Sequence, residues 1–96
     1  MINNQLKEMI LELCTEDNYG VWELYWNYQG LVGDENVDDE LFINVVHELV
    51  RDKKIAPYLE NDVKPCSFDV ERLKMELKRV KQRGTVEGLY WFGLIR

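Results

Sequence analysis

The sequence predicts an α+β domain in which three helices form a core and two strands form an antiparallel ribbon, with a fourth helix inserted between the strands. Three observations predict it: four segments carry apolar residues at helical spacing, two short segments are rich in branched and aromatic residues, and turn residues separate these segments. With 96 residues, 46% hydrophobic and 31% charged, the chain is expected to form one domain over residues 1–96.

The first helix is expected from Asn4 to Thr15. Its apolar residues recur at steps of three and four, on one face of a helix: Leu6, Met9, Ile10 and Leu13.

The second helix is expected within DNYGVWELYWNYQGL, residues 17–31, where ten residues hold five of the eleven aromatic residues. Asp17 or Asn18 is expected to cap its start, and Gly30 and Gly33 to end it. Its apolar residues cover most of its circumference, as in a buried helix. We therefore expect its rings chiefly to fill the core, with a Tyr hydroxyl or a Trp edge reaching the surface.

A third helix follows an acidic segment. Its apolar residues between Val37 and Val50 form an amphipathic stripe, and Asn36 or Asp38 is the expected N-cap. Acidic residues in the first turn and basic residues after Val50 both suit the helix dipole.

The last third of the chain is expected to contain both strands. Residues Ile55 to Glu60 form the first, which Pro57 restricts to a sheet edge or a strand end. Ser67 is expected to cap a fourth helix from Phe68 to Arg83, whose narrow apolar stripe places it on the outside. The tail from Thr85 to Ile95 should pair with the first strand.

Charge is divided unevenly along the chain, whose net value is −6. Residues 1–62 hold fourteen acidic and four basic residues, whereas residues 63–96 hold four acidic and eight basic ones. Such a balance repels phosphate backbones and favours a basic partner. No segment resembles a signal peptide or a membrane span, so we expect a cytoplasmic protein without a membrane partner, in which Cys14 and Cys66 are reduced thiols.

The acidic run between the second and third helices is the sharpest feature. It has five carboxylates in seven residues: Asp34, Glu35, Asp38, Asp39 and Glu40. One interpretation is a solvated loop before a helix that favours acids at its start. The other is a negative surface that docks on a positively charged cleft, with carboxylates in the place of phosphates.

The basic residues of the fourth helix do not by themselves indicate DNA binding. We expect them to form a solvated face, partly paired with nearby acids: Arg72, Lys74, Lys78, Arg79, Lys81 and Arg83. The third helix offers mainly acids where a DNA-reading helix offers bases and amides, although Asn44 and Arg51 leave duplex binding open.

No catalytic pattern is present. His47 is the single histidine and has no nucleophile or orienting acid at a recognisable spacing, and no phosphate loop or metal-ligand motif occurs. We therefore expect no enzymatic activity, no cofactor and no metal site.

The segment D-N-Y-G-V-W-E, residues 17–23, resembles a group of small bacterial winged-helix proteins with the pattern D-Y-G-[LV]-W-E. The later pieces L-V-R-D-K-K-I-A-P-Y-L, residues 49–59, and L-Y-W-F-G-L-I, residues 89–95, match as well. The resemblance implies a winged-helix-like fold, here with Asn18 inserted and a basic helix between the strands. Some of these proteins resemble immunity proteins of contact-dependent inhibition systems, which neutralise a toxin domain.

The sequence thus favours an immunity protein that binds a basic toxin domain, such as a nuclease, through the acidic run. Three further residues are flanking contacts in this hypothesis, Tyr58, Glu60 and Asp62, and Trp91 is a candidate anchor, with Tyr90 as its alternative. The alternatives are a winged-helix transcription regulator, a protein-binding adaptor, or a homodimer built on exposed aromatic residues. We expect a monomer or a weak dimer.

Overall fold

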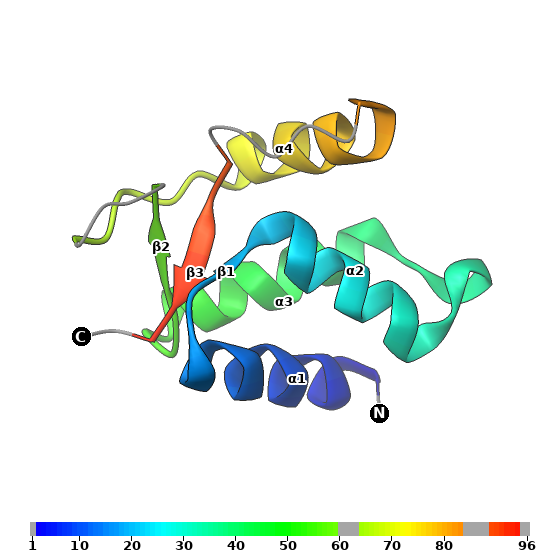
Figure 1. Ribbon diagram of the computed structural model, residues 1–96, viewed down its shortest axis with the longest axis horizontal. Helices are drawn as coiled ribbons and strands as arrows, with labels where there is room; N and C mark the ends of the chain where they lie inside the picture. The colour runs from blue at the N-terminus through cyan, green and yellow to red at the C-terminus, as the bar shows by residue number, and fades with distance from the viewer. Residues whose placement is uncertain (1, 60–63, 84–88, 95–96) are drawn as a thin grey trace.

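A computed structural model describes residues 2–59, 64–83 and 89–94. Four α-helices, one short 3₁₀ helix and a three-stranded antiparallel sheet make up these ranges, which confirms the α+β class (Figure 1). Their order along the chain is α1 (Ile2–Glu16), β1 (Tyr19–Gly20), α2 (Val21–Val32), η1 (Asp34–Asn36), α3 (Asp39–Arg51), β2 (Ala56–Tyr58), α4 (Val70–Arg83) and β3 (Trp91–Gly93).

The sheet has the strand order β1-β3-β2, so β3 lies in the centre. The two predicted strands pair as expected, with Tyr58 opposite Trp91, and α4 lies between them in the chain. Strand β2 is an edge strand, which accommodates Pro57 because a proline nitrogen cannot donate to a neighbouring strand. Strand β1 was not predicted; its two residues pair with Trp91 and Phe92.

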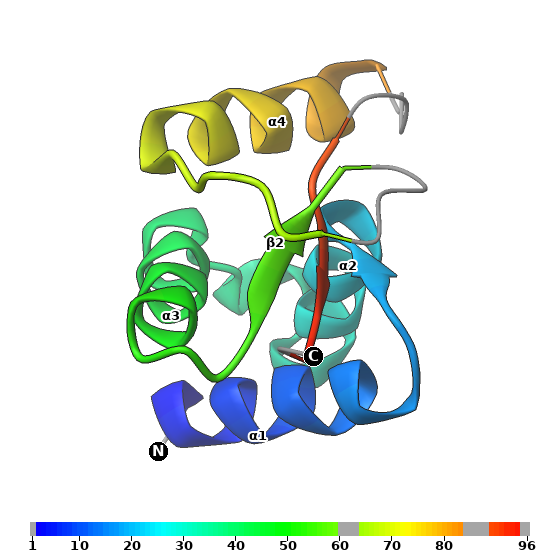
Figure 2. The ribbon, with the colours of Figure 1, turned by 90° about the vertical axis from the view of Figure 1, so that its left-hand side faces the viewer.

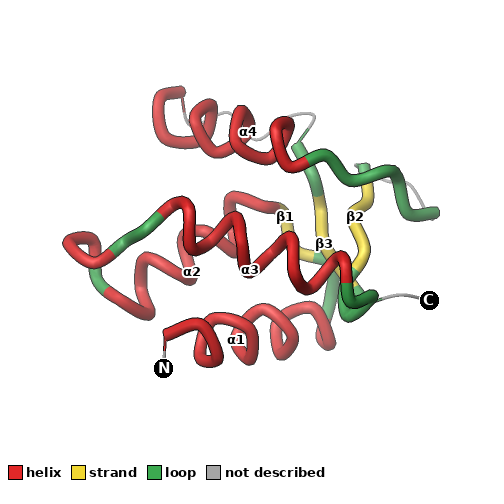
Figure 3. The backbone as a smooth tube through the Cα atoms, turned by 180° about the vertical axis from the view of Figure 1, so that it is seen from behind, coloured by secondary structure: helices red, strands yellow, loops and turns green. Residues whose placement is uncertain are grey.

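The sheet lies at one end of the three helices α1, α2 and α3. Seen towards the sheet, α1 and α4 lie on opposite sides of it and α2 and α3 extend behind it (Figure 2). From behind, α3 runs between α1 and α4 (Figure 3). The turn that joins α2 to α3 therefore lies at the end of the molecule away from the sheet, as Figures 1 and 3 both show.

The capping residues were predicted correctly for α3 and incorrectly for α2. Oδ1 of Asp38 accepts a hydrogen bond from the backbone N–H of Leu41 at 3.1 Å, as an N-cap should. Neither Asp17 nor Asn18 caps α2, because β1 intervenes and Gly20 becomes its N-cap residue. Carboxylate oxygen Oε1 of Glu23 accepts from the N–H of Gly20 instead.

The end of α2 and the start of α4 also differ from the prediction. Gly30 lies inside α2, and Gly33 ends it with a φ of 82°, a conformation that glycine adopts without strain. Helix α4 begins at Val70, where Oδ1 of Asp69 accepts from the N–H of Glu71 at 3.0 Å. The predicted cap Ser67 makes no side-chain hydrogen bond found among the described residues, and its carbonyl oxygen accepts from the hydroxyl of Tyr90.

The rings of α2 fill the core, as predicted. Tyr25 and Tyr28 are 2% and 0% exposed, and both pack on Phe42 of α3 with ring centroids 5.3 and 5.7 Å apart. Trp26 is the exception, with 51% of its surface exposed. The stripe of α4 is buried against this core at Leu73, Leu77 and Val80.

Candidate protein-binding surface

The five carboxylates of the acidic run lie together at the end of the molecule away from the sheet. Asp34 and Glu35 belong to η1, Asp38 is the N-cap of α3, and Asp39 and Glu40 begin α3. We call these five residues the acidic surface. Four of them line an open depression of about 580 Å³ together with side chains of α2 and α4; its lining is Tyr25, Gln29, Asp34, Val37, Asp38, Asp39, Glu40 and Lys81.

Asp38 has a structural task in this surface. Its carboxylate caps α3, and its backbone N–H donates to the hydroxyl of Tyr28 at 3.0 Å, while that hydroxyl lies 3.4 Å from the carbonyl oxygen of Asp38. These bonds fix the start of α3 to the buried ring of Tyr28.

Asp39 is neutralised within the molecule. Nζ of Lys81 donates to its Oδ2 at 2.7 Å, and the hydroxyl of Tyr25 donates to its Oδ1. Burial opposes ionisation of Asp39, but these two hydrogen bonds outweigh it and lower its pKa. Burial and the bond to Asp39 both raise the pKa of Tyr25. One of the five predicted charges is thus paired with the late basic helix.

Three carboxylates remain open. Asp34, Glu35 and Glu40 are exposed, and none of them takes part in an ion pair or side-chain hydrogen bond found among the described residues. An uncompensated group of like charges costs stability in the free molecule through mutual repulsion and attracts opposite charge. The charges of these three carboxylates therefore face solvent and are not used in ion pairs among the described residues.

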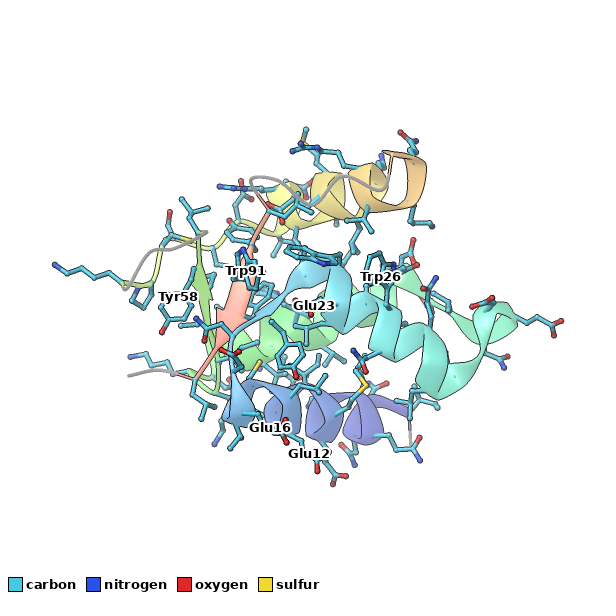
Figure 4. All side chains as sticks on the ribbon, in the orientation of Figure 1. Glu12, Glu16, Glu23, Trp26, Tyr58 and Trp91 are labelled. Carbon is cyan, nitrogen blue, oxygen red and sulfur yellow. The ribbon has the colours of Figure 1, made fainter. Side chains whose placement is uncertain are left out.

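Two of the other predicted contact residues lie far from this surface. Tyr58 and Trp91 lie at the sheet, at the other end of the molecule from η1 (Figure 4). Tyr58 is 4% exposed and its hydroxyl donates to the carbonyl oxygen of Leu94 at 3.1 Å, so it supports the sheet. Glu60 and Asp62 lie outside the described residues.

Trp91 is half-buried and has an intramolecular partner. Its ring meets that of Trp22 edge to face, with centroids 5.0 Å apart. Tyr90, its alternative, is 1% exposed. The two candidate anchors on the last strand thus lie at the sheet, away from the acidic surface, and one of them is buried.

Trp26 is an exposed aromatic residue that was not among the predicted contact residues. It projects from α2 on the side that faces α4 (Figure 4), and Gln29, three residues later on the same helix, lines the depression. Trp26 is thus an i, i+3 neighbour of a residue at the acidic surface.

The basic face of α4 is partly paired, as predicted. Ion pairs join Arg72 to Glu76 at 2.8 Å and Lys74 to Glu71 at 3.4 Å, in addition to the bond between Lys81 and Asp39. The face is therefore less positive than its sequence suggests.

Cys14 and His47 differ in exposure, since Cys14 is buried and His47 is exposed. Burial raises the pKa of Cys14 to about 12, so this thiol is protonated at neutral pH, and its Sγ lies 3.6 Å from the carbonyl oxygen of Phe92. His47 is exposed and stacks on Phe68 with ring centroids 6.1 Å apart.

In residues 2–59, 64–83 and 89–94, no three His, Cys, Asp or Glu side chains are grouped so that they would hold a metal ion. No helix in the same ranges has the length and apolar character that crossing a membrane requires.

Comparison of the chain with protein-family models, with curated proteins and with solved structures gives no match.

Proposed function

We propose that this chain is a winged-helix-like immunity protein that binds and neutralises a basic toxin domain, such as a nuclease, through its acidic surface. Three helices, α1, α2 and α3, precede β2 in the chain, and β2 pairs with β3 across the inserted helix α4. This order supports the winged-helix-like assignment. The observation that carries the functional proposal is the open group of carboxylates at Asp34, Glu35 and Glu40.

Open carboxylates suit this task for two reasons. They attract a cationic surface over several ångströms, so a complementary protein associates faster than an uncharged one, by about 10²- to 10³-fold at low salt. They also accept hydrogen bonds from the Arg and Lys side chains with which a nuclease holds phosphates. A protein that fills such a cleft excludes the nucleic acid substrate.

The structure divides the acidic surface into residues that can be changed safely and residues that cannot. Asp38 and Asp39 hold α3 in place, so their replacement would mix folding with binding. Asp34, Glu35 and Glu40 have no such role. The informative variant is therefore the triple replacement Asp34→Asn, Glu35→Gln and Glu40→Gln.

The probe is the purified C-terminal domain encoded by the adjacent upstream reading frame, as an active-site variant. Stopped-flow association at low and at physiological salt should show an on-rate about tenfold lower for the triple variant, with the loss shrinking as salt rises. The matched control is Glu8→Gln, Glu12→Gln and Glu16→Gln, which changes the same charge at three exposed positions of α1. Equal effects of the two triple variants, or no binding by the wild type, would refute the proposal.

The alternative is a winged-helix regulator that reads DNA with α3. Asn44 and His47 are exposed on this helix, which keeps the alternative open, whereas Arg51 already pairs with Asp52 and Glu48. A gel-shift titration with random duplex distinguishes the two: the immunity proposal predicts no retardation at physiological salt.

A further inference from the structure

A glycine lies on the exposed side of α2, at a position where none of the described residues requires one. Gly30 lies within the helix, it has no positive φ, and a Cβ atom at this position would meet no atom of the described residues within 4 Å. Glycine is among the poorest residues in a helix interior, second only to proline. Neither the backbone of α2 nor its packing against the described residues explains this choice.

The exposed neighbours of Gly30 within α2 are uncharged. Trp26 lies four residues before Gly30, and Asn27 lies four residues before Leu31, so the two pairs are neighbours on one side of the helix. We call these four exposed residues the outer face of α2. Trp26 is 51% exposed and Leu31 is 42% exposed. The outer face of α2 carries no charged side chain, although 31% of the chain is charged.

This face is continuous with the acidic surface. Gln29 precedes Gly30 in the chain and lines the acidic depression, and Asp34 and Glu35 follow α2 directly after Gly33. Trp26 projects towards α4 (Figure 4), and Lys81 of α4 is one of the residues that line the depression. An exposed Trp and a bare patch of backbone therefore border a group of open carboxylates.

We infer that the outer face of α2 is the apolar anchor on which a basic protein partner packs, with Trp26 as the central side chain and Gly30 as the point of closest approach. The inference rests on the proposed function and names the part of the surface that holds the partner after the carboxylates have attracted it. The partner segment that fits is an apolar helix or loop flanked by Lys or Arg. Desolvated Trp residues are typical anchors of such interfaces, and charged residues typically form the rim.

A second copy of this chain fits the face less well. Each copy carries its own acidic surface beside α2, so a symmetric pair would bring like charges together on a chain whose net charge is already −6. A basic partner gains from the same carboxylates. The charge of the acidic surface thus favours a basic protein over a second copy of this chain as the partner of the outer face of α2.

The test uses two variants that leave the acidic surface unchanged. Gly30→Gln places a long side chain at the point of approach in a residue that favours helix, and Trp26→Ala removes the anchor. With the domain of the adjacent reading frame as the probe, each should raise the dissociation constant about tenfold or more, mainly through faster dissociation and with on-rates within about twofold of the wild type. The thermal midpoint of Gly30→Gln should equal or exceed that of the wild type.

Matched controls separate this effect from a general loss of apolar or small residues. Met75→Ala removes a side chain of α4 that is 65% exposed, and Asn4→Gln enlarges an exposed position of α1; both should bind as the wild type does.

Three results would overturn the inference. If both outer-face variants bind normally while the acidic triple variant associates slowly, the anchor is elsewhere and the proposed function stands. If the wild type does not bind the domain, both fail. If sedimentation shows a wild-type dimer that Gly30→Gln dissociates, a second copy occupies the face.

Discussion

Nζ of Lys81 lies 2.7 Å from Oδ2 of Asp39, and this contact joins the last part of α4 to the first turn of α3. Half of the Lys81 side chain is exposed, and 36% of that of Asp39. The pair therefore contributes little stability, on the order of 1 kcal/mol or less, because water screens it. Its larger effect is on the acidic surface, where it cancels one of five charges.

Removal of this lysine should speed association with a basic domain. Lys81→Gln leaves Asp39 without its cation and makes the depression more negative, so the on-rate at low salt should rise about two- to fivefold. Stopped-flow mixing measures it. Lys78→Gln changes the same charge on an exposed neighbouring position of α4 and should have a smaller effect. An on-rate that falls in Lys81→Gln would mean that the lysine itself contacts the partner.

The bond between Asp39 and Lys81 also predicts how stability depends on pH. The folded state lowers the pKa of Asp39 from its ordinary value of 3.8, so its contribution is present above that value and is lost as pH falls through the lower folded-state pKa. Asp39→Asn should therefore be less stable than the wild type at pH 7, by about 1 kcal/mol. The difference should shrink below pH 3.8. Urea unfolding at pH 7 and at stepwise lower pH measures both, and a constant difference would contradict the assignment.

Local signals predicted most of the fold. The stripe and the N-cap of α3 follow from Asp38 and the residues after it, and Pro57 correctly indicated an edge strand. Strand β1 could not be predicted from local signals, because two residues are too few to show an alternating pattern. They form a strand by pairing with β3, which lies more than 70 residues later in the chain. Once β1 is present, Gly20 starts α2, and the predicted caps Asp17 and Asn18 lie too far upstream.

The candidate site was predicted in part. The grouping of the five acids was predictable because they lie within seven residues of the sequence. The pairing of Asp39 with Lys81 was not, because these residues are 42 apart and meet only where α4 packs on α3. Trp91, with Tyr90 as its alternative, was the candidate anchor because Trp and Tyr are typical anchor residues. The structure leaves Trp26 of α2 exposed while Tyr25 and Tyr28 of the same helix are buried, and helical spacing accounts for this difference.

Glu76 should be more important to stability than any surface ion pair. It is 2% exposed, its Oε2 accepts from Nε of Arg72 and its Oε1 accepts from the backbone N–H of Tyr90, so it ties α4 to the segment that leads into β3. Glu76→Ala leaves that N–H without an acceptor and should cost about 2–3 kcal/mol. Urea unfolding monitored by Trp fluorescence measures this loss.

The neutral variant Glu76→Gln is the informative comparison. Burial raises the pKa of Glu76 against the opposing bonds from Tyr90 and Arg72, which means that the fold disfavours its charge. An amide oxygen still accepts from Tyr90, so Glu76→Gln should cost about 1 kcal/mol or less. If Gln and Ala destabilise equally, the charge rather than the hydrogen bond holds the segment. Glu71→Gln, exposed on the same helix, should change stability by less than about 0.5 kcal/mol.

Two glycines of the same part of the chain should respond to alanine with opposite signs. A Cβ atom on Gly20 would lie 2.2 Å from the ring of Trp22, closer than atoms tolerate, and that ring is fixed against Trp91. Gly20→Ala must therefore displace a packed indole and should cost about 1–3 kcal/mol. In Gly30→Ala the new Cβ atom meets no atom of the described residues within 4 Å, and the substitution removes backbone freedom from the unfolded chain, so it should raise the free energy of unfolding by about 0.5–1 kcal/mol. Thermal and urea unfolding of the two variants measure both. Destabilisation by Gly30→Ala would show that the fold itself needs this glycine, and its presence would then say nothing about a partner.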